Sequence, residues 1–190
     1  KFLVNWEEGQ KTGFFIDQRV NRDLVRQYSK GRKVLNTFCY TGGFSVAALA
    51  GGAKEVVSID LSERAAKLAD ENVRLNFGDE APHKAIACNA VEYLKDIDAD
   101  YDLIILDPPA FAKHHKVLGN ALQGYKKINA RALEKIRPGG ILFTFSCSQA
   151  VSRDLFRTTI FTAAAIAKRK VRIIGQLTQP ADHPINIYHP

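Results

Sequence analysis

Short apolar runs alternate with helical stretches along most of this chain, and this alternation restricts the fold more than any other feature. The segments between the runs show helical spacing of apolar residues, as at 61–73, or end at a glycine pair, as at 51–52. Repeated strand–helix units predict an α/β fold: a Rossmann-like, doubly wound, mostly parallel sheet with helices on both faces. The expected strands are 33–38, 55–60, 83–88, 101–107 and 141–146.

The two ends of the chain are predicted from weaker patterns. "KFLVNW" and "GFFID" flank "EEGQKT" and indicate an N-terminal β-hairpin, followed by a helix that carries Arg19, Arg22 and Arg26. Beyond the third strand, helices are expected over 118–136, closed by Pro138-Gly139-Gly140, and over 152–169, with a last strand near 171–178. We therefore divide the chain into an N-terminal segment, 1–24, and a main domain, 25–190.

Composition and charge narrow the class of protein. With 190 residues, 46% of them apolar and 25% charged, the chain is long enough for one domain with a real core. No apolar run is long enough to span a membrane. The three isolated cysteines, Cys39, Cys88 and Cys147, argue against a disulfide framework and a metal site, and suit the reducing cytoplasm. The net charge of +7 indicates a polyanionic partner.

Polar residues follow each expected strand. Ligands of parallel sheets bind at the carboxyl ends of the strands, and polar side chains collected at one edge exceed what core packing requires. These strand ends carry Asn36, Asp60, Asn89, Asp107 and Cys147.

The glycine-rich turn after the first strand, "NTFCYTGGFS", lets the backbone approach a ligand. It has no lysine for a phosphate-binding P-loop, and its Gly42-Gly43 pair is a weak match to a dinucleotide fingerprint. S-adenosylmethionine needs no phosphate cradle. Asp60 can accept hydrogen bonds from both ribose hydroxyls of that cofactor, and Asn89-Ala90 is placed for the adenine edge. The loop and Asp60 together favour the methyl donor.

Several motifs strengthen this interpretation. The chain resembles class I S-adenosylmethionine-dependent methyltransferases, and more narrowly the bacterial enzymes that methylate C5 of cytosine in large-subunit (23S) ribosomal RNA. That family usually carries an RNA-binding domain before the region matched here, so the chain is expected to be part of a longer protein. The motifs are "KTGFFIDQRVNR", "VLNTFCYTGGFSVAAL", "DPPAF", "GYKKIN", "TFSCS" and "ADHP".

The resemblance implies a set of cofactor-binding residues. Asp17, Gln18 and Arg19 would close over S-adenosylmethionine. Its methionine end would lie against the first loop, and its ribose against the end of the second strand. The remaining residues implied are Asn36, Phe38, Thr41, Gly42, Asp60, Leu61, Asn89, Ala90 and Asp107.

C5 of a pyrimidine is a poor nucleophile, so its methylation needs covalent help. A thiolate that adds to C6 makes C5 nucleophilic; a base then removes the C5 proton and the thiolate leaves. In the family that the chain resembles, the cysteine of "TFSCS", here Cys147, is that nucleophile. Asp107 is expected to bind the base or help to take the proton. A flipped base would lie near Pro108, Pro109, Phe111 and Lys113.

The expected partner is RNA, which the protein would recognise in single-stranded loops and through phosphate contacts. A ring-nitrogen or amino-group methyltransferase on adenine or guanine remains a rival, but such an enzyme needs no nucleophilic cysteine. The other rival is a cofactor-binding module without catalysis. The sequence leaves the oligomeric state open. Candidate phosphate contacts are Lys113, His114, His115, Lys116, Lys126, Lys127, Lys168, Arg169 and Lys170.

Overall fold

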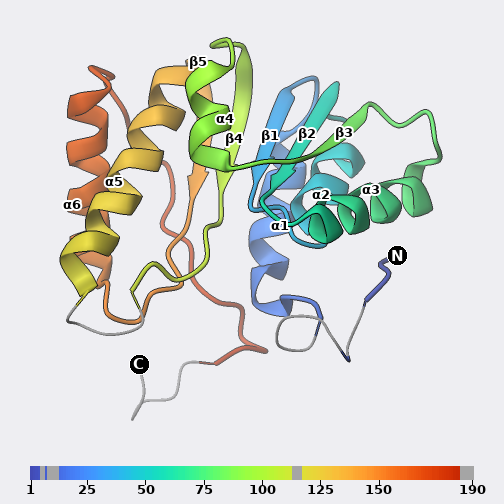
Figure 1. Cartoon of the computed structure of the whole chain (residues 1–190), viewed down its shortest axis with the longest axis horizontal. Helices are drawn as coiled ribbons and strands as arrows, with labels where there is room; N and C mark the ends of the chain where they lie inside the picture. Colours follow the sequence, from blue (N-terminus) through green and yellow to red (C-terminus); the bar gives the residue numbers. More distant parts are fainter. Residues whose placement is uncertain (5–6, 8–12, 113–116, 185–190) are drawn as a thin grey trace.

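Five parallel strands form the centre of the structure, a computed structural model that describes residues 1–4, 7, 13–112 and 117–184 (Figure 1). The strand order is β3-β2-β1-β4-β5. All five expected strands are present, so the predicted α/β class is confirmed. Their bounds are β1 Lys33–Thr37, β2 Glu55–Asp60, β3 His83–Ala87, β4 Tyr101–Leu106 and β5 Ile136–Thr144.

Helices cover both faces of this sheet. On one face α1 and α2 pack on the sheet through Val25, Phe44 and Ala48, with α3 beside them; on the other face α4 and α5 pack through Leu94 and Ile128. α6 packs on α5 rather than on the sheet. The helices are α1 Arg19–Tyr28, α2 Gly43–Ala50, α3 Glu63–Phe77, α4 Ala90–Asp96, α5 Leu118–Lys135 and α6 Arg153–Ile166, after a 3-10 turn, η1, at Ile16–Gln18.

The sheet reverses its winding between β1 and β4. The chain proceeds from β1 to β2 and β3 on one side, then returns to place β4 on the other side of β1. Thr37 pairs with Leu106 at the last rung, and the Thr37 hydroxyl donates to the Ile105 carbonyl oxygen over 2.8 Å. Such a switch point is where open α/β sheets bind their ligands.

The Pro138-Gly139-Gly140 turn lies inside β5, whereas the sequence analysis placed it after a helix. α5 ends at Lys135, and Ile136 already pairs with Tyr101 in β4. The register then shifts before Ile141 pairs with Leu103. Glycine allows this bulge because an added Cβ at Gly140 would lie 3.0 Å from the Asp102 carbonyl oxygen of β4.

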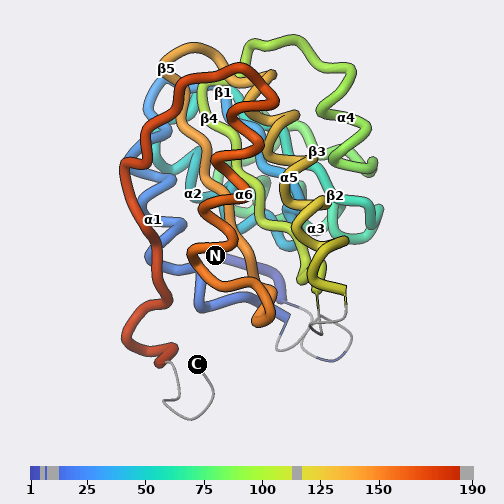
Figure 2. Tube along the Cα trace, turned by 90° about the vertical axis from the view of Figure 1, so that its left-hand side faces the viewer, coloured from blue at the N-terminus to red at the C-terminus, as the bar shows by residue number. Residues whose placement is uncertain are grey.

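Both terminal predictions were wrong over the residues that the structure describes. Residues 1–4 and 13–15 contain no strand, while residues 5–6 and 8–12 of the expected hairpin lie outside the described residues. Residues 171–178 are not a strand either: they run past α1 (Figure 2), and Ile173 and Ile174 are 62% and 70% exposed. A strand needs a hydrogen-bonded neighbour, so apolar alternation alone did not identify one here.

Gly51 provides a test of the packing between α1 and the turn after α2. An added Cβ would overlap the Arg26 carbonyl and lie 3.0 Å from Arg26 Cα, whereas Gly119 in α5 has open space. Gly51→Ala should therefore lower the free energy of unfolding by about 1–3 kcal/mol. Gly119→Ala should raise it by about 0.5–1 kcal/mol, since alanine favours helix. Urea denaturation measures both; equal stability of the two variants would contradict this packing.

Candidate functional site

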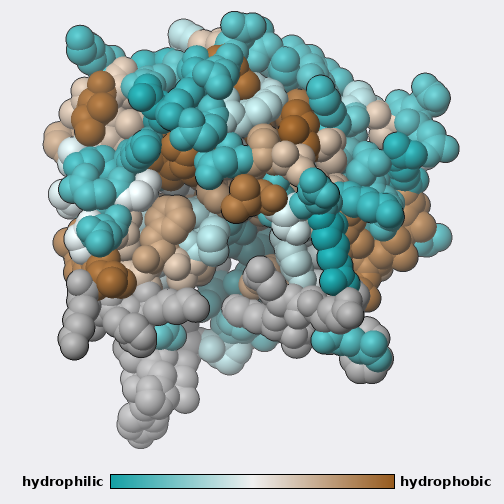
Figure 3. Space-filling model, viewed as in Figure 1, coloured by the Kyte–Doolittle hydropathy of each residue, from teal (hydrophilic) through white to brown (hydrophobic). Residues whose placement is uncertain are grey.

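The candidate site lies where β1 and β4 end side by side. On the face shown in Figure 3, the surface is hollowed between α1 and the loops that follow β4 and β5. The loop after β1 begins at Phe38, and the loop after β4 begins at Asp107, one residue beyond the paired Thr37 and Leu106. The switch point thus brings two of the sequence-predicted regions together.

Asp60 holds the loop after β1 in a strained conformation. Phe38 and Tyr40 have backbone φ angles of 56° and 45°, values that residues other than glycine rarely adopt. The Tyr40 backbone N–H donates to Asp60 Oδ2 over 3.0 Å, and the Ser62 N–H donates to Oδ1 over 3.0 Å. A carboxylate has about four acceptor positions, so Asp60 keeps acceptor capacity for a further ligand. Strain of this kind concentrates at binding sites.

Gly42 brings the same loop close to α3. Its φ is +75°, and an added Cβ would lie 2.9 Å from Ala69, so only glycine fits. The neighbouring Thr41 is buried, and its carbonyl oxygen accepts from Asn72 Nδ2 over 2.9 Å. The loop is therefore fixed from α3 as well as from β2.

Asn36 carries an unsatisfied acceptor at the end of β1. The residue is 1% exposed, and its Nδ2 donates to Ser45 Oγ over 2.8 Å. Its Oδ1 is buried and has no partner among the described residues. A buried acceptor without a partner is costly, and it suits a ligand that brings a donor such as an ammonium group. The residues present thus fit the amino-acid end of S-adenosylmethionine.

The N-terminal segment reaches the site through Gln18. Its Nε2 donates to Asp107 Oδ1 over 3.3 Å, and its Oε1 accepts from Asn21 Nδ2 over 2.6 Å. Arg19 instead points to the C-terminal segment, where it pairs with Asp182 at 3.0 Å in an exposed contact. Motifs from the two ends of the chain therefore meet beside α1, as Figure 2 allows the reader to follow.

Arg22 belongs to this region, although the sequence analysis treated it only as a helix charge. Its Nη1 donates to the Phe15 carbonyl oxygen over 2.7 Å, and its guanidinium lies 4.6 Å from the Phe14 ring centre. Burial lowers the pKa of Arg22, while Asp17 and Asp107 oppose that shift. Its place at the end of the motif "KTGFFIDQRVNR" was the signal in the sequence for this role.

Asp107 has an unusual environment for a carboxyl group. Burial, helped by repulsion from Asp17, raises the pKa of Asp107 to about 7, although Arg22 and the hydrogen bond from Gln18 pull that pKa down. A carboxyl with a pKa near neutrality can exchange a proton with a reacting group at physiological pH.

Cys147 is the exposed cysteine of the three, whereas Cys39 is buried and Cys88 partly buried. Its Sγ lies 3.6 Å from the Pro108 carbonyl oxygen, directly beside the loop after β4. Burial raises the pKa of both Cys39 and Cys88, which disfavours their thiolates. Exposure and position therefore select Cys147 as the cysteine able to meet a substrate.

Ser148 joins the loop of Cys147 to the loop after β4. Its Oγ accepts from the Ala112 N–H over 3.1 Å and lies 2.9 Å from the Tyr125 hydroxyl. Tyr125 is fully buried, and its ring lies 4.6 Å from that of Phe111. The sequence analysis missed this role for Tyr125 and Ser148; their presence in "GYKKIN" and "TFSCS" was the signal.

The other expected site residues are spread around this centre. Pro108 is buried and Pro109 exposed, so the second proline is open to a substrate. Leu61 is 73% exposed at the end of β2, and the buried Ala90 begins α4. Asn89 Oδ1 caps α4 by accepting from Val91 N–H over 2.9 Å, which leaves its Nδ2 for a ligand. Lys113 lies outside the described residues.

Comparison with known proteins supplies the family. Residues 1–186 match the family described as S-adenosylmethionine-dependent methyltransferase. The chain belongs to this family. Its cofactor is S-adenosylmethionine, and the α/β architecture described above is that of the family's solved structures.

Curated relatives are named by a ribosomal substrate. A protein of Aeromonas hydrophila named ribosomal RNA large subunit methyltransferase I is 43% identical over 193 residues. A Pseudoalteromonas atlantica protein of the same name is 45% identical. Each match covers 100% of this chain and 49% of the relative, so the chain spans about half the length of the curated relatives it matches.

Solved structures agree with the fold. One described as a methyltransferase complexed with S-adenosylhomocysteine is 29% identical with a TM-score of 0.85, covering 98% of this chain and 49% of its own. A Streptococcus mutans protein described as a SAM-dependent methyltransferase is 28% identical with a TM-score of 0.82, covering 95% and 47%.

Two classes of feature are missing from the part of the chain that the structure describes. In residues 1–4, 7, 13–112 and 117–184, no group of three or more metal-binding side chains comes together. Within the same ranges, no helix has the length and apolar content needed to cross a membrane.

The raised pKa of Asp107 has a consequence for stability. The folded chain holds this proton up to about pH 7, and the unfolded chain releases it near 4, so ionised Asp107 progressively destabilises the fold as pH rises from 4 to 7. Asp107→Asn should therefore gain stability relative to the wild type over that range, by at most about 4 kcal/mol at pH 8. Urea denaturation at pH 4.5, 6 and 8 measures the difference. Asp98→Asn, at an exposed aspartate, is the control; a pH-independent gain for Asp107→Asn would contradict the assignment.

Proposed function

We propose that the chain is the catalytic part of an RNA methyltransferase that forms 5-methylcytidine in 23S ribosomal RNA, with Cys147 as nucleophile. The observation that carries the proposal is the exposed Cys147 thiol, 3.6 Å from the Pro108 carbonyl oxygen at the switch point of the sheet. The names of the relatives support a large-subunit ribosomal RNA substrate. Such a substrate corresponds to an enzyme of the cytoplasm.

The cofactor would lie across the ends of β1 and β2. Asn36, Phe38, Thr41 and Gly42 would receive its methionine end, where Asn36 Oδ1 has no other partner among the described residues. Asp60 would accept hydrogen bonds from the ribose with its remaining acceptor positions. Leu61, Asn89 and Ala90 would border the adenine, and Asp17, Gln18 and Arg19 would cover the site.

S-adenosylmethionine would supply an electrophilic methyl group to a base held near Asp107 and Pro108. The Cys147 thiolate adds to C6 of cytosine, and the electron pair of the C5–C6 double bond becomes available at C5. C5 would take the methyl group as the bond between that methyl and the cofactor's sulfur breaks, leaving S-adenosylhomocysteine. A base would then remove the C5 proton, and the electrons of that C–H bond would restore the ring as the thiolate leaves. Each step therefore balances without an oxidant or a metal.

Asp107 is suited to the proton transfer. A carboxyl with a pKa of about 7 is partly ionised at neutral pH and can accept a proton from C5. Its hydrogen bond from Gln18 orients the Oδ1 atom and leaves Oδ2 for the substrate. Pro109 and Phe111 would contact the flipped base, with Lys113 nearby in sequence.

RNA binding is proposed to extend from this site over basic surfaces. On α5, Lys127 is exposed and Lys126 partly exposed. Lys168 and Lys170 are exposed and Arg169 partly exposed just beyond α6, at the edge of the sheet away from the site, so they would meet RNA that passes around α6 (Figure 1). Counter-charges of this kind bind phosphate without reading sequence. His114, His115 and Lys116, expected to act with them, lie outside the described residues.

A rival enzyme would methylate a nitrogen of adenine or guanine. That chemistry gives no task to an exposed thiol beside Pro108, so we place it second. A cofactor-binding module without catalysis is third, because it gives no task to a carboxyl of neutral pKa. Product analysis separates all three.

Substitution of the nucleophile is the decisive test of the proposal. Cys147→Ala should abolish formation of 5-methylcytidine, by at least about 1,000-fold, because the thiolate addition cannot occur. Its affinity for S-adenosylhomocysteine should stay unchanged. The assay is nucleoside mass spectrometry after incubation with labelled S-adenosylmethionine and unmodified 23S ribosomal RNA.

Cys88→Ala is the matched control and should keep wild-type turnover, since Cys88 packs against the core. If Cys147→Ala also keeps it, the thiolate mechanism is wrong. Label on an adenine or guanine nitrogen would instead support the first rival, and no label with normal cofactor binding would support the second.

The ribose role of Asp60 is tested by cofactor affinity. Asp60→Ala removes the acceptors for Tyr40 N–H and for the proposed ribose, so binding of S-adenosylhomocysteine should weaken by about 1–3 kcal/mol. Isothermal titration calorimetry measures this, with Asp154→Ala in the first turn of α6 as the control. Unchanged affinity in Asp60→Ala would remove Asp60 from the cofactor site.

A further inference from the structure

A line of hydrogen-bonded, buried polar side chains runs from Asn36 in the central strand β1 to His83 in the edge strand β3. Asn36 Nδ2 donates to Ser45 Oγ over 2.8 Å, Ser45 Oγ lies 2.6 Å from Ser58 Oγ, and Ser58 Oγ lies 2.7 Å from His83 Nε2. Ser45 and Ser58 are fully buried, and the His83 side chain is 1% exposed. Hydrophobic side chains fill most of this core, so four adjoining polar groups need a reason.

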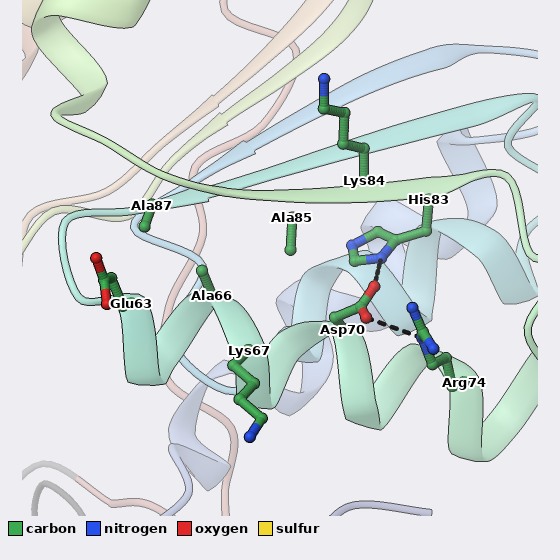
Figure 4. Close-up of a pocket in the computed structure, with 9 residues that line it drawn as sticks. All are labelled: Glu63, Ala66, Lys67, Asp70, Arg74, His83, Lys84, Ala85 and Ala87. Atoms are coloured by element: carbon green, nitrogen blue, oxygen red, sulfur yellow. Dashed lines mark hydrogen bonds and ion pairs between the residues drawn. The ribbon is translucent and has the colours of Figure 1, made fainter.

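The line ends in charged groups at a pocket between α3 and β3. His83 Nδ1 lies 3.3 Å from Asp70 Oδ1, and Asp70 Oδ2 pairs with Arg74 Nε at 2.8 Å. Figure 4 shows these three side chains pointing toward one another in that pocket. Arg74 therefore holds one carboxyl oxygen of Asp70, and the other, Oδ1, faces His83 as a hydrogen-bond acceptor.

This end fixes the direction of every hydrogen bond in the line. Asp70 Oδ1 accepts, so neutral His83 carries its proton on Nδ1 and presents Nε2 as an acceptor. Ser58 must then donate to His83, and Ser45, which has a single proton, must donate to Ser58. The remaining bond can form only if Asn36 donates its Nδ2 to Ser45, which turns Asn36 Oδ1 away from Ser45.

We propose that His83 is a positioning residue for the cofactor, acting through Ser58 and Ser45 to hold the Asn36 amide with Oδ1 directed at the cofactor's ammonium group. The inference rests on the proposed cofactor site at Asn36. It explains why Oδ1 lacks a partner among the described residues. The directions of the hydrogen bonds in the line leave Asn36 Oδ1 as an acceptor for a ligand that brings a donor.

A proton on His83 would reverse the line. Nε2–H would donate to Ser58, Ser58 to Ser45, and Ser45 to Asn36, whose amide would flip to accept. The nitrogen of Asn36 would then face the ammonium group, and two donors would oppose each other. Cofactor binding therefore requires neutral His83.

The surroundings of His83 favour its neutral form. Burial lowers the pKa of His83, while Asp70 opposes that shift and Arg74 adds to it. From β2 the Ser58 hydroxyl faces it, and on its own strand the neighbouring Lys84 is exposed. Glu63 and Lys67 of α3 are the other charged residues that line the pocket. At neutral pH the hydrogen bonds of the line therefore run in the direction that leaves Asn36 Oδ1 free to accept. This direction is lost as pH falls through the pKa of His83.

The tautomer of His83 is the first test, and it needs no cofactor. Long-range ¹H–¹⁵N correlation spectra at pH 8 distinguish a proton on Nδ1 from one on Nε2, and comparison with His83→Gln assigns the signal. The proposal expects the Nδ1–H tautomer. A proton on Nε2 would reverse the Ser58 bond and overturn the proposal.

Binding of S-adenosylhomocysteine by the wild type and by Ser58→Ala is the second test. Ser58→Ala interrupts the line and should weaken binding about threefold to tenfold at pH 8. At a pH below the pKa of His83, which a titration of the same NMR signals locates, the ratio of the two dissociation constants should approach one, because protonated His83 has already reversed the line in the wild type. The ratio cancels the titration of Asp107, which both proteins share.

Ser29→Ala is the matched control, since it removes an equally buried hydroxyl that bonds only to the Val25 carbonyl oxygen. It should leave the affinity unchanged at both pH values. A pH-independent ratio, or equal losses in Ser58→Ala and Ser29→Ala, would overturn the proposal. Failure of the wild type to bind at all would instead count against the proposed cofactor site, and the tautomer would still decide the line.

Discussion

The pairing of β1 with β4 determines where the chemistry of this protein can lie. It places the last residues of two central strands at one rung, with Thr37 opposite Leu106. One loop then carries the strained backbone of Phe38, and the other carries Asp107. Neither loop could reach the other from separate sheets or from antiparallel strands, whose ends alternate. A cofactor and its acceptor must meet in one place, and this rung provides it.

Three different supports hold that place rigid. Asp60 fixes the loop after β1 by accepting from the Tyr40 N–H, and Ser148 fixes the loop after β4 by accepting from the Ala112 N–H. Gln18 joins the N-terminal segment to Asp107. Each support is a hydrogen bond between residues far apart in the sequence, and together they replace the apolar packing that a site open to ligand lacks. Burial and the neighbouring Asp17 keep the pKa of Asp107 near neutral, against the opposing effects of Arg22 and of the hydrogen bond from Gln18.

The sequence predicted the sheet well because central parallel strands are buried on both faces and read as continuous apolar runs. It predicted the site residues at strand ends for the same reason, since Asp60, Asp107 and Cys147 each follow such a run. It failed at 171–178, where β-like alternation exists without a strand to pair with. The line through Ser45, Ser58 and His83 could not be foreseen, because its members come from three elements and share no spacing pattern. Arg22 was missed because its partners lie in two other segments.

Asp17, Gln18 and Arg19, proposed above to cover the cofactor, make weak contacts with the site beneath them, whereas Lys1 and Leu3 hydrogen-bond to Asn76 and Asn72 of α3. One hydrogen bond of 3.3 Å reaches Asp107, and the ion pair of Arg19 with Asp182 is exposed and therefore adds little. Asn21 and Arg22 bind this segment to α1, not to the sheet. In the proposed cofactor site, the spent cofactor would leave by displacement of the turn at Ile16–Gln18, while residues 1–4 stay bound to α3.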